Sequence, residues 1–163
     1  MLAWLQRILQ ALLTERVSIR DLPTILEGVQ EACAGNTRPI QAIVGHVRTR
    51  LARQISESYV GPGGYIPLVT LSPEWDETFN EALVGPPEDR QLAIAPSKLQ
   101  EFMTRLRAAF DAASGIGEAP VLLTSGVIRF HVHAIVDRIR PGTPVLAQAE
   151  IFPRARIRTV DTI

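Results

Sequence analysis

The sequence changes character within residues 61–71, GPGGYIPLVTL. Glycine and proline fill positions 61–64, which form the strongest turn signal in the chain. The segment that follows is short, apolar and rich in β-branched side chains, so it predicts a strand. Pro67 should lie near the start of this strand or on a sheet edge, because proline has no N–H to donate. We therefore predict an all-helical subdomain over residues 1–62 and an α/β subdomain over residues 63–163.

The part of the chain before residue 61 has the apolar spacing of helices. Three helices are predicted, over residues 2–13, 22–33 and 40–55. Ser18 or Asp21 can accept from the exposed amides that open the second helix, and Pro23 fits its first turn. Gly35 is suited to a left-handed cap at the end of that helix.

The part after residue 64 alternates predicted strands with predicted helices. Ser72-Pro73-Glu74 has the capping serine, early proline and acidic first turn of a helix start. Strands are predicted at residues 66–71, 91–95, 120–124, 144–147 and 156–160, and further helices at 97–113 and 128–139. This alternation predicts an α/β sheet with at least one parallel pairing. The expected fold class is therefore mixed: a helical subdomain followed by a small α/β subdomain.

The composition is that of an ordinary globular protein. Of the 163 residues, 46% are hydrophobic and 21% are charged, which excludes wholesale disorder. A single cysteine excludes an internal disulfide framework. No apolar run approaches the length of a membrane span, so we expect a soluble, cytosolic type of chain.

The net charge is zero, but the charges are unevenly distributed. Residues 1–64 carry seven basic and five acidic side chains, residues 65–119 carry four and nine, and residues 120–163 carry six and three. Opposed patches of this kind favour docking with another copy or another protein. The alternative is a solvated surface whose charges happen to segregate.

No constellation of side chains predicts catalysis. His131 and His133 are two positions apart in a predicted helix, where their side chains would point about 200° apart, so a shared metal is not expected. Cys33 lies on the apolar face of its helix, which favours a buried filler over a nucleophile. We therefore expect no enzymatic activity, no cofactor and no metal.

Thr124-Ser125-Gly126 stands where a predicted strand meets a predicted helix. Exposed amides at such a place can hold an anion. The same residues also make an ordinary helix cap, and no glycine-rich fingerprint accompanies them. An α/β domain that binds an anionic ligand at Ser125-Gly126 is therefore the alternative function.

Three arginines, Arg154, Arg156 and Arg158, alternate with smaller or apolar residues near the C-terminus. In a strand this spacing puts three guanidinium groups on one face. The row is either a solvated face that guards an edge against aggregation, or a docking strip for an acidic partner or a neighbouring subunit. Little aromatic interleaving accompanies the arginines, which disfavours nucleic acid.

The three predicted N-terminal helices also allow a helix-turn-helix interpretation. It would place Arg48, Arg50 and Arg53 on the last helix, pointing away from the core and toward DNA. The motif is too permissive to outweigh the neutral charge of the chain. We therefore predict no nucleic-acid partner.

Three blocks of sequence resemble the export-gate family of type III secretion. They are LQRILQALL at 5–13 leading into VSIRDLPTILE at 17–27, then PVLLTS at 120–125, and finally PVL at 144–146 with EI at 150–151 and PRARIRTV at 153–160. The likeness covers nearly the whole chain in the right order. The ending at 153–160 favours the flagellar branch of the family over the virulence branch.

The resemblance implies a place for this chain within a larger membrane protein. It would cover the third, all-helical, and the fourth, thioredoxin-like α/β, subdomains of a cytosolic region at the cytoplasmic face of the bacterial inner membrane, with the membrane reached only through a preceding bundle of helices. Such regions form a nine-membered ring and receive export chaperone–substrate complexes and the ATPase stalk protein. The last subdomain is implied in contacts with the stalk protein, so we take Arg154, Arg156 and Arg158 as candidate docking residues.

Overall fold

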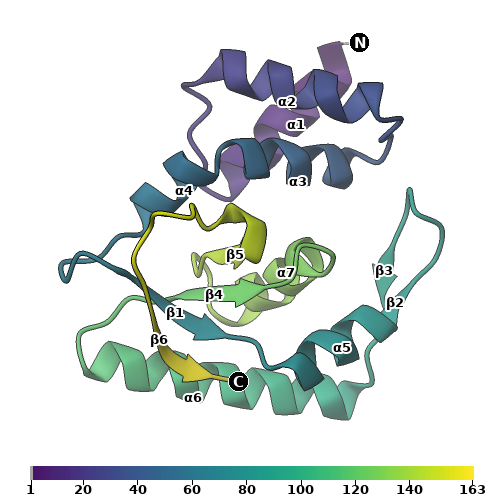
Figure 1. The fold of residues 1–163 in the computed structure, drawn as a ribbon. Coiled ribbons are helices and arrows are strands. Elements are labelled where there is room, and N and C mark those ends of the chain that lie inside the picture. The colour runs from purple at the N-terminus through teal and green to yellow at the C-terminus, as the bar shows by residue number, and fades with distance from the viewer. Residues whose placement is uncertain (1) are drawn as a thin grey trace.

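The computed structural model describes residues 2–163, which form helices on both faces of a parallel sheet (Figure 1). The first four helices are α1 (Leu2–Thr14), α2 (Leu22–Ala34), α3 (Ile40–Arg50) and α4 (Ala52–Ser58). The α/β part has strands β1 (Ile66–Thr70), β2 (Leu83–Val84), β3 (Gln91–Leu92), β4 (Val121–Thr124), β5 (Val145–Ala147) and β6 (Ile157–Thr162). Its helices are α5 (Pro73–Ala82), α6 (Pro96–Gly115), α7 (Arg129–Ile139) and the short 3-10 helix η1 (Gln148–Glu150). The predicted mixed class, with a parallel sheet, is confirmed.

Helix α2 begins where its capping residues predict and ends differently. The carboxylate of Asp21 accepts from the Thr24 N–H at 3.3 Å, and Pro23 lies in the first turn. At the other end Gly35 has a φ of −81°, whereas Asn36 has a φ of +63°. The prediction for Gly35 was therefore wrong: the left-handed residue is Asn36, a residue type that tolerates this conformation better than most.

The predicted helix over residues 40–55 is divided at Leu51 into α3 and α4. The Leu51 N–H reaches the carbonyls of both Val47 and Arg48 at 3.0 Å, so the turn tightens locally toward 3-10 geometry. Leu51 is nevertheless buried, as is Ile55 in α4. The apolar stripe therefore continues across the break, which is why spacing alone predicted one helix.

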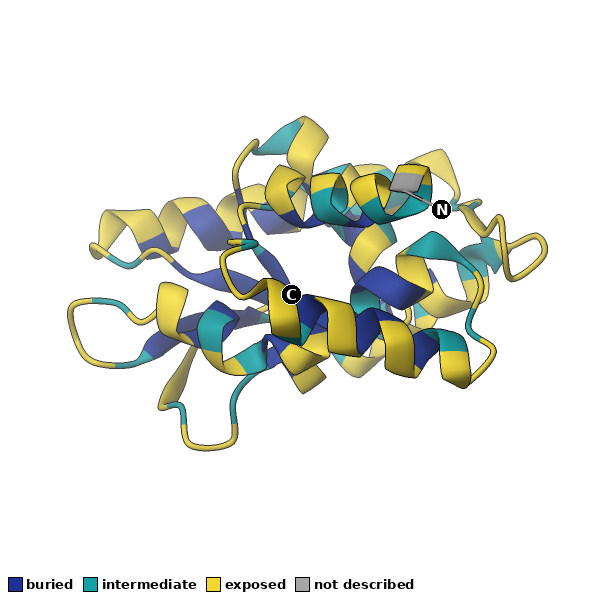
Figure 2. Cartoon of the chain, turned by 90° about the horizontal axis from the view of Figure 1, so that it is seen from above, coloured by how far each residue is buried: buried dark blue, intermediate teal, exposed yellow. Residues whose placement is uncertain are grey.

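The sheet has four strands in the order β5-β4-β1-β6, and every pairing is parallel. Neighbouring residues of a strand face opposite sides, as Leu68 and Val69 of β1 show. One side forms a core with α1–α4 and the other forms a core with α5–α7. Figure 2 shows the resulting pattern, with exposed residues on the outer faces of the helices and buried residues toward the sheet.

The connection from β5 to β6 crosses the sheet from one edge to the other. It begins with η1, which contacts α3 and α4, and it runs between α4 and the sheet before β6 joins β1 (Figure 1). The crossover therefore lies between the helical part and the α/β part. Within residues 2–163, no helix combines the length and apolar content needed to cross a bilayer.

Candidate docking surface

The predicted arginine row lies at the end of the crossover, and only its last member is in a strand. Phe152–Ala155 forms a turn closed by the Ala155 N–H, which donates to the Phe152 carbonyl at 2.9 Å, and Arg154 is inside that turn. The geometry predicted for the row was therefore wrong. Pro153 fixes its own φ near the value that a turn requires, and the strand begins only after it.

All three arginines of the row are exposed, but their contacts differ. Arg158 lies over the ring of Tyr65, with its Cζ 5.6 Å from the ring centroid, and its Nη1 is 3.4 Å from the Tyr65 hydroxyl. That hydroxyl in turn donates to Glu118. Among the residues that the structure describes, Arg154 and Arg156 make no side-chain hydrogen bond or ion pair. The row therefore offers two unpaired guanidinium groups and one that is already held.

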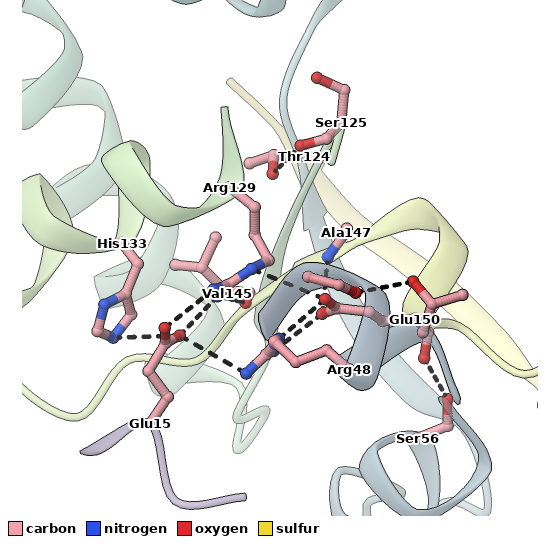
Figure 3. Close-up of polar contacts among 12 residues, drawn as sticks. Glu15, Arg48, Ser56, Thr124, Ser125, Arg129, His133, Val145, Ala147 and Glu150 are labelled. Carbon is pink, nitrogen blue, oxygen red and sulfur yellow. Dashed lines mark hydrogen bonds and ion pairs between the residues drawn. The ribbon is translucent and has the colours of Figure 1, made fainter. Parts of the chain in front are cut away.

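A buried cluster of four charged side chains lies where the helical part meets the α/β part (Figure 3). Glu15 follows α1, Arg48 belongs to α3, Arg129 opens α7 and Glu150 ends η1. Figure 3 shows these four side chains pointing toward one another. Their formal charges cancel, so the cluster joins the two parts without burying net charge.

Each arginine of this cluster holds a glutamate with two hydrogen bonds. Arg48 donates from Nε and Nη2 to the two carboxylate oxygens of Glu150, both at 2.8 Å. Arg129 donates from Nη1 and Nη2 to Glu15 at 2.5 and 2.9 Å, and its Nη1 also reaches the Val145 carbonyl at 3.1 Å. Paired forks of this kind are the strongest ionic contacts that arginine makes.

Two members of the cluster, Glu15 and Arg48, have pKa values that are shifted toward their charged forms. Burial by itself would raise the pKa of Glu15, but the hydrogen bonds from Arg129 and the charges of Arg129 and Arg48 outweigh burial and hold that pKa below its usual value. Burial likewise opposes the charge on Arg48, yet its bonds to Glu150 raise the pKa of the guanidinium. Glu15 and Arg48 are therefore both stabilised in their charged forms, and the paired hydrogen bonds fix the helical part to the α/β part.

The helix-turn-helix interpretation fails at Arg48. It requires this side chain to point outward, whereas its exposed fraction is 2%. Of the other two arginines, Arg50 pairs with Glu27 at 2.8 Å and Arg53 with Glu57 at 3.1 Å. The last predicted helix therefore presents no row of outward arginines to a DNA groove.

The predicted anion site at Ser125-Gly126 is taken by a side chain of the protein itself. The backbone N–H and hydroxyl of Ser125 both donate to the carboxylate of Asp76, at 3.1 and 2.9 Å. Ser125 is not a helix cap either, because α7 begins four residues later at Arg129 and its N-cap residue makes no side-chain bond. The donors that suggested a ligand instead fix the β4–α7 turn to α5.

The histidines and the cysteine lie in positions that agree with their structural interpretations. His131 and His133 are both on α7, as predicted, and the Nε2 of His133 is 3.8 Å from Glu15. Burial lowers the pKa of His131. Cys33 is half-buried and packs against the helical core. No cluster of three or more metal-binding side chains occurs in the described part of the chain.

The sequence prediction missed the buried charge cluster. Arg48 carried one available signal, because it lies on the same helical face as Val44, Leu51 and Ile55. An arginine on an apolar stripe indicates a buried partner. The identity of that partner, Glu150, requires the fold.

Residues 1–156 match the FHIPEP family. The chain belongs to this family. It is 52% identical over 158 residues to the flagellar biosynthesis protein FlhA of Caulobacter vibrioides, a match that covers 97% of the chain and 22% of the relative. The curated FHIPEP relatives are thus several times longer than this chain.

Solved structures are similar to this chain in sequence and in fold. The structure of the Chlamydia pneumoniae CdsV and CdsO protein complex matches with a TM-score of 0.89 at 28% identity, covering 99% of this chain and 47% of the other. The nonameric EscV cytosolic domain from the type III secretion system matches with a TM-score of 0.75 at 25% identity, covering 96% and 46%. The chain spans about half the length of these structures.

Proposed function

We propose that this chain is the last part of the cytosolic region of a flagellar type III export gate. In this role residues 1–62 and 63–163 are its third and fourth cytosolic subdomains, and the whole protein is anchored in the bacterial inner membrane. The chain takes part in a ring of nine copies and has no catalytic activity. Membership of the FHIPEP family and 52% identity to a flagellar FlhA support this proposal.

The chain serves as a docking platform for the ATPase stalk protein, and the gate receives export chaperone–substrate complexes. The observation that carries this part of the proposal is the exposed arginine row, in which Arg154 and Arg156 have no partner within the described residues. A related protein, CdsV, has been solved in complex with CdsO, which supports docking of another protein on this kind of domain.

Calorimetric titration with the stalk protein of the same organism tests the docking role. The variant changes Arg154, Arg156 and Arg158 together to glutamate. A matched control changes three other exposed arginines, Arg20, Arg90 and Arg107, and so alters the net charge by the same amount.

We expect the wild-type chain to bind the stalk protein with an affinity that falls as salt rises, because exposed charges are screened. The row variant should bind at least about tenfold more weakly, while the control should stay within about twofold. Equal binding by the row variant and the wild type would remove the docking role. Parallel titration with a chaperone–cargo complex then asks whether the same residues serve the second partner.

A further inference from the structure

An apolar groove adjoins the arginine row between α4 and the turn at residues 152–155. Its volume is about 210 Å³. The side chains around it are those of Arg53, Ser56, Glu57, Val60, Phe152, Arg154 and Ala155. We call it the α4–β6 groove. Val60 is 44% exposed, and Phe152 and Ala155 are half-buried, so an apolar surface is open to solvent at this place.

The floor of the α4–β6 groove is fixed by one buried hydroxyl. Ser56 is 1% exposed; its Oγ donates to the Glu150 carbonyl and accepts from the Phe152 N–H, both at 2.9 Å. These two bonds hold the crossover against α4 on either side of Ile151. Because Glu150 is itself held by Arg48, the groove is formed before any partner arrives, which lowers the ordering cost of binding.

The charged side chains that line the groove, Arg53, Glu57 and Arg154, leave it with a net positive charge. Arg53 lies on one side with its Cζ 5.8 Å from the Phe152 ring centroid, and Arg154 lies on the other side within the turn. The Oε1 of Glu57 lies 3.1 Å from the Nε of Arg53 and neutralises its charge. Arg154 and the adjoining Arg156 remain unpaired within residues 2–163. An apolar pocket with one uncompensated arginine in its lining and a second beside it, both within the described residues, is complementary to a partner that offers an apolar side chain next to carboxylates.

We propose that the α4–β6 groove receives one large apolar side chain of an acidic protein segment, whose flanking carboxylates pair with Arg154 and Arg156. This inference rests on the proposed docking role and adds to it the place and chemistry of the contact. Charge accounts for the steering of the partner, and the apolar anchor accounts for its position. Val60 is the exposed wall of the groove, so a change there tests whether the groove is used. The leucine and alanine versions of a peptide with equal charge separate the apolar contribution from the charge.

The test compares Val60→Glu with Ile116→Glu, a control that places the same charge on a 73% exposed apolar residue at the end of α6. Both variants keep every arginine, and thermal melts followed by circular dichroism check that both fold. The first probe is the stalk protein of the same organism. The second is a short helical peptide of glutamate and alanine with one central leucine, together with its leucine-to-alanine version.

We expect Val60→Glu to weaken stalk binding about tenfold or more, because burial of the partner's apolar side chain in the groove would be lost. Ile116→Glu should leave the affinity within about twofold. The leucine peptide should bind the wild-type chain more tightly than the alanine peptide, and Val60→Glu should abolish the difference. These two results together support the groove.

The outcomes separate this inference from the docking role. If stalk binding depends on the arginine row but not on Val60, the proposed role of the groove is overturned and the docking role of the arginines is supported. If the stalk protein does not bind at all, a leucine-dependent, Val60-dependent peptide signal still supports the groove, and equal binding of the two peptides overturns it. A loss of self-association rather than of partner binding in Val60→Glu would also overturn it, because the occupant would then be a second copy.

Discussion

Two sets of arginines in this protein have opposite environments. Arg48 and Arg129 are buried between the helical part and the sheet, and each holds a glutamate with two hydrogen bonds. Arg154 and Arg156 stand on the exposed end of the crossover without a partner among the described residues. The same residue type therefore stabilises the fold in one place and stands exposed to solvent in the other. Position relative to the core, not residue type, decides which.

The buried set also determines the geometry of the exposed set. Glu150, held by Arg48, ends η1, and the next residues form the turn that carries Arg154. A change in the buried cluster should therefore reach the docking surface through the backbone of residues 150–155. The reverse does not hold, because the exposed arginines contribute little to the core.

The largest expected effect is that of Arg48→Met. This change leaves Glu150, which is 2% exposed, without its two shortest hydrogen bonds, and removing one member of a buried ion pair costs about 3–5 kcal/mol. Urea unfolding followed by circular dichroism measures the loss in the free energy of unfolding.

Arg154→Met is the matched control for Arg48→Met. We expect it to change the free energy of unfolding by no more than about 0.5 kcal/mol, because the side chain is exposed and has no partner in the part of the chain that the structure describes. Equal losses in the two variants would end the distinction between the two sets of arginines. If Arg48→Met does not fold, Arg48→Lys retains the charge and gives a smaller loss that can still be measured against the control.

A smaller effect concerns Glu15 and pH. The pKa of Glu15 is lowered in the folded protein from its ordinary value of 4.5, so the unfolded chain binds the proton more readily. The stability that Glu15 contributes is therefore fully present above about pH 4.5 and is lost as the pH falls through the lowered pKa. Glu15→Gln should cost about 1.5–3 kcal/mol near neutral pH, the worth of hydrogen bonds to a charged group, and should flatten the acid limb of the stability curve.

Unfolding measured from about pH 3 to about pH 7 tests the Glu15 prediction. Glu57→Gln is the control, since Glu57 is exposed and, within residues 2–163, pairs with Arg53 alone. We expect its curve to follow that of the wild type. An acid limb in Glu15→Gln as steep as that of the wild type would mean that other carboxylates dominate acid unfolding.

Local patterns predicted much of the fold. Apolar spacing located every long helix, and the Ser72 cap and the parallel sheet followed from short-range signals. The charge cluster could not be predicted in the same way, because Arg48 and Glu150 are 102 positions apart and Glu15 and Arg129 are 114 apart. Sequence spacing indicates which face of a helix is buried, but only the packed fold decides which charges meet there.

The prediction of an anion site at Ser125-Gly126 was wrong for a related reason. Ser125 has the donors that an anion needs, and the sequence correctly placed it between a strand and a helix. Asp76, from a helix 49 positions away, uses both donors. The three arginines of the row are exposed, but the strand geometry predicted for them was wrong because Pro153 favours a turn. Its docking role remains a prediction.

The smallest expected effect distinguishes Arg158 from the other two arginines of the row. Arg158→Ala removes a guanidinium that lies over the Tyr65 ring, and an exposed cation–π contact contributes about 0.5–1 kcal/mol. Arg156→Ala removes an unpaired side chain and should leave the free energy of unfolding nearly unchanged. A double-mutant cycle of Arg158→Ala with Tyr65→Leu isolates the contact, because each single change removes the same interaction. A coupling energy near zero would mean that Arg158, like Arg154 and Arg156, is free to pair with a partner. A measurable coupling means that Arg158 must leave its stack before it can pair with a partner, so Arg154 and Arg156 should then carry more of the binding.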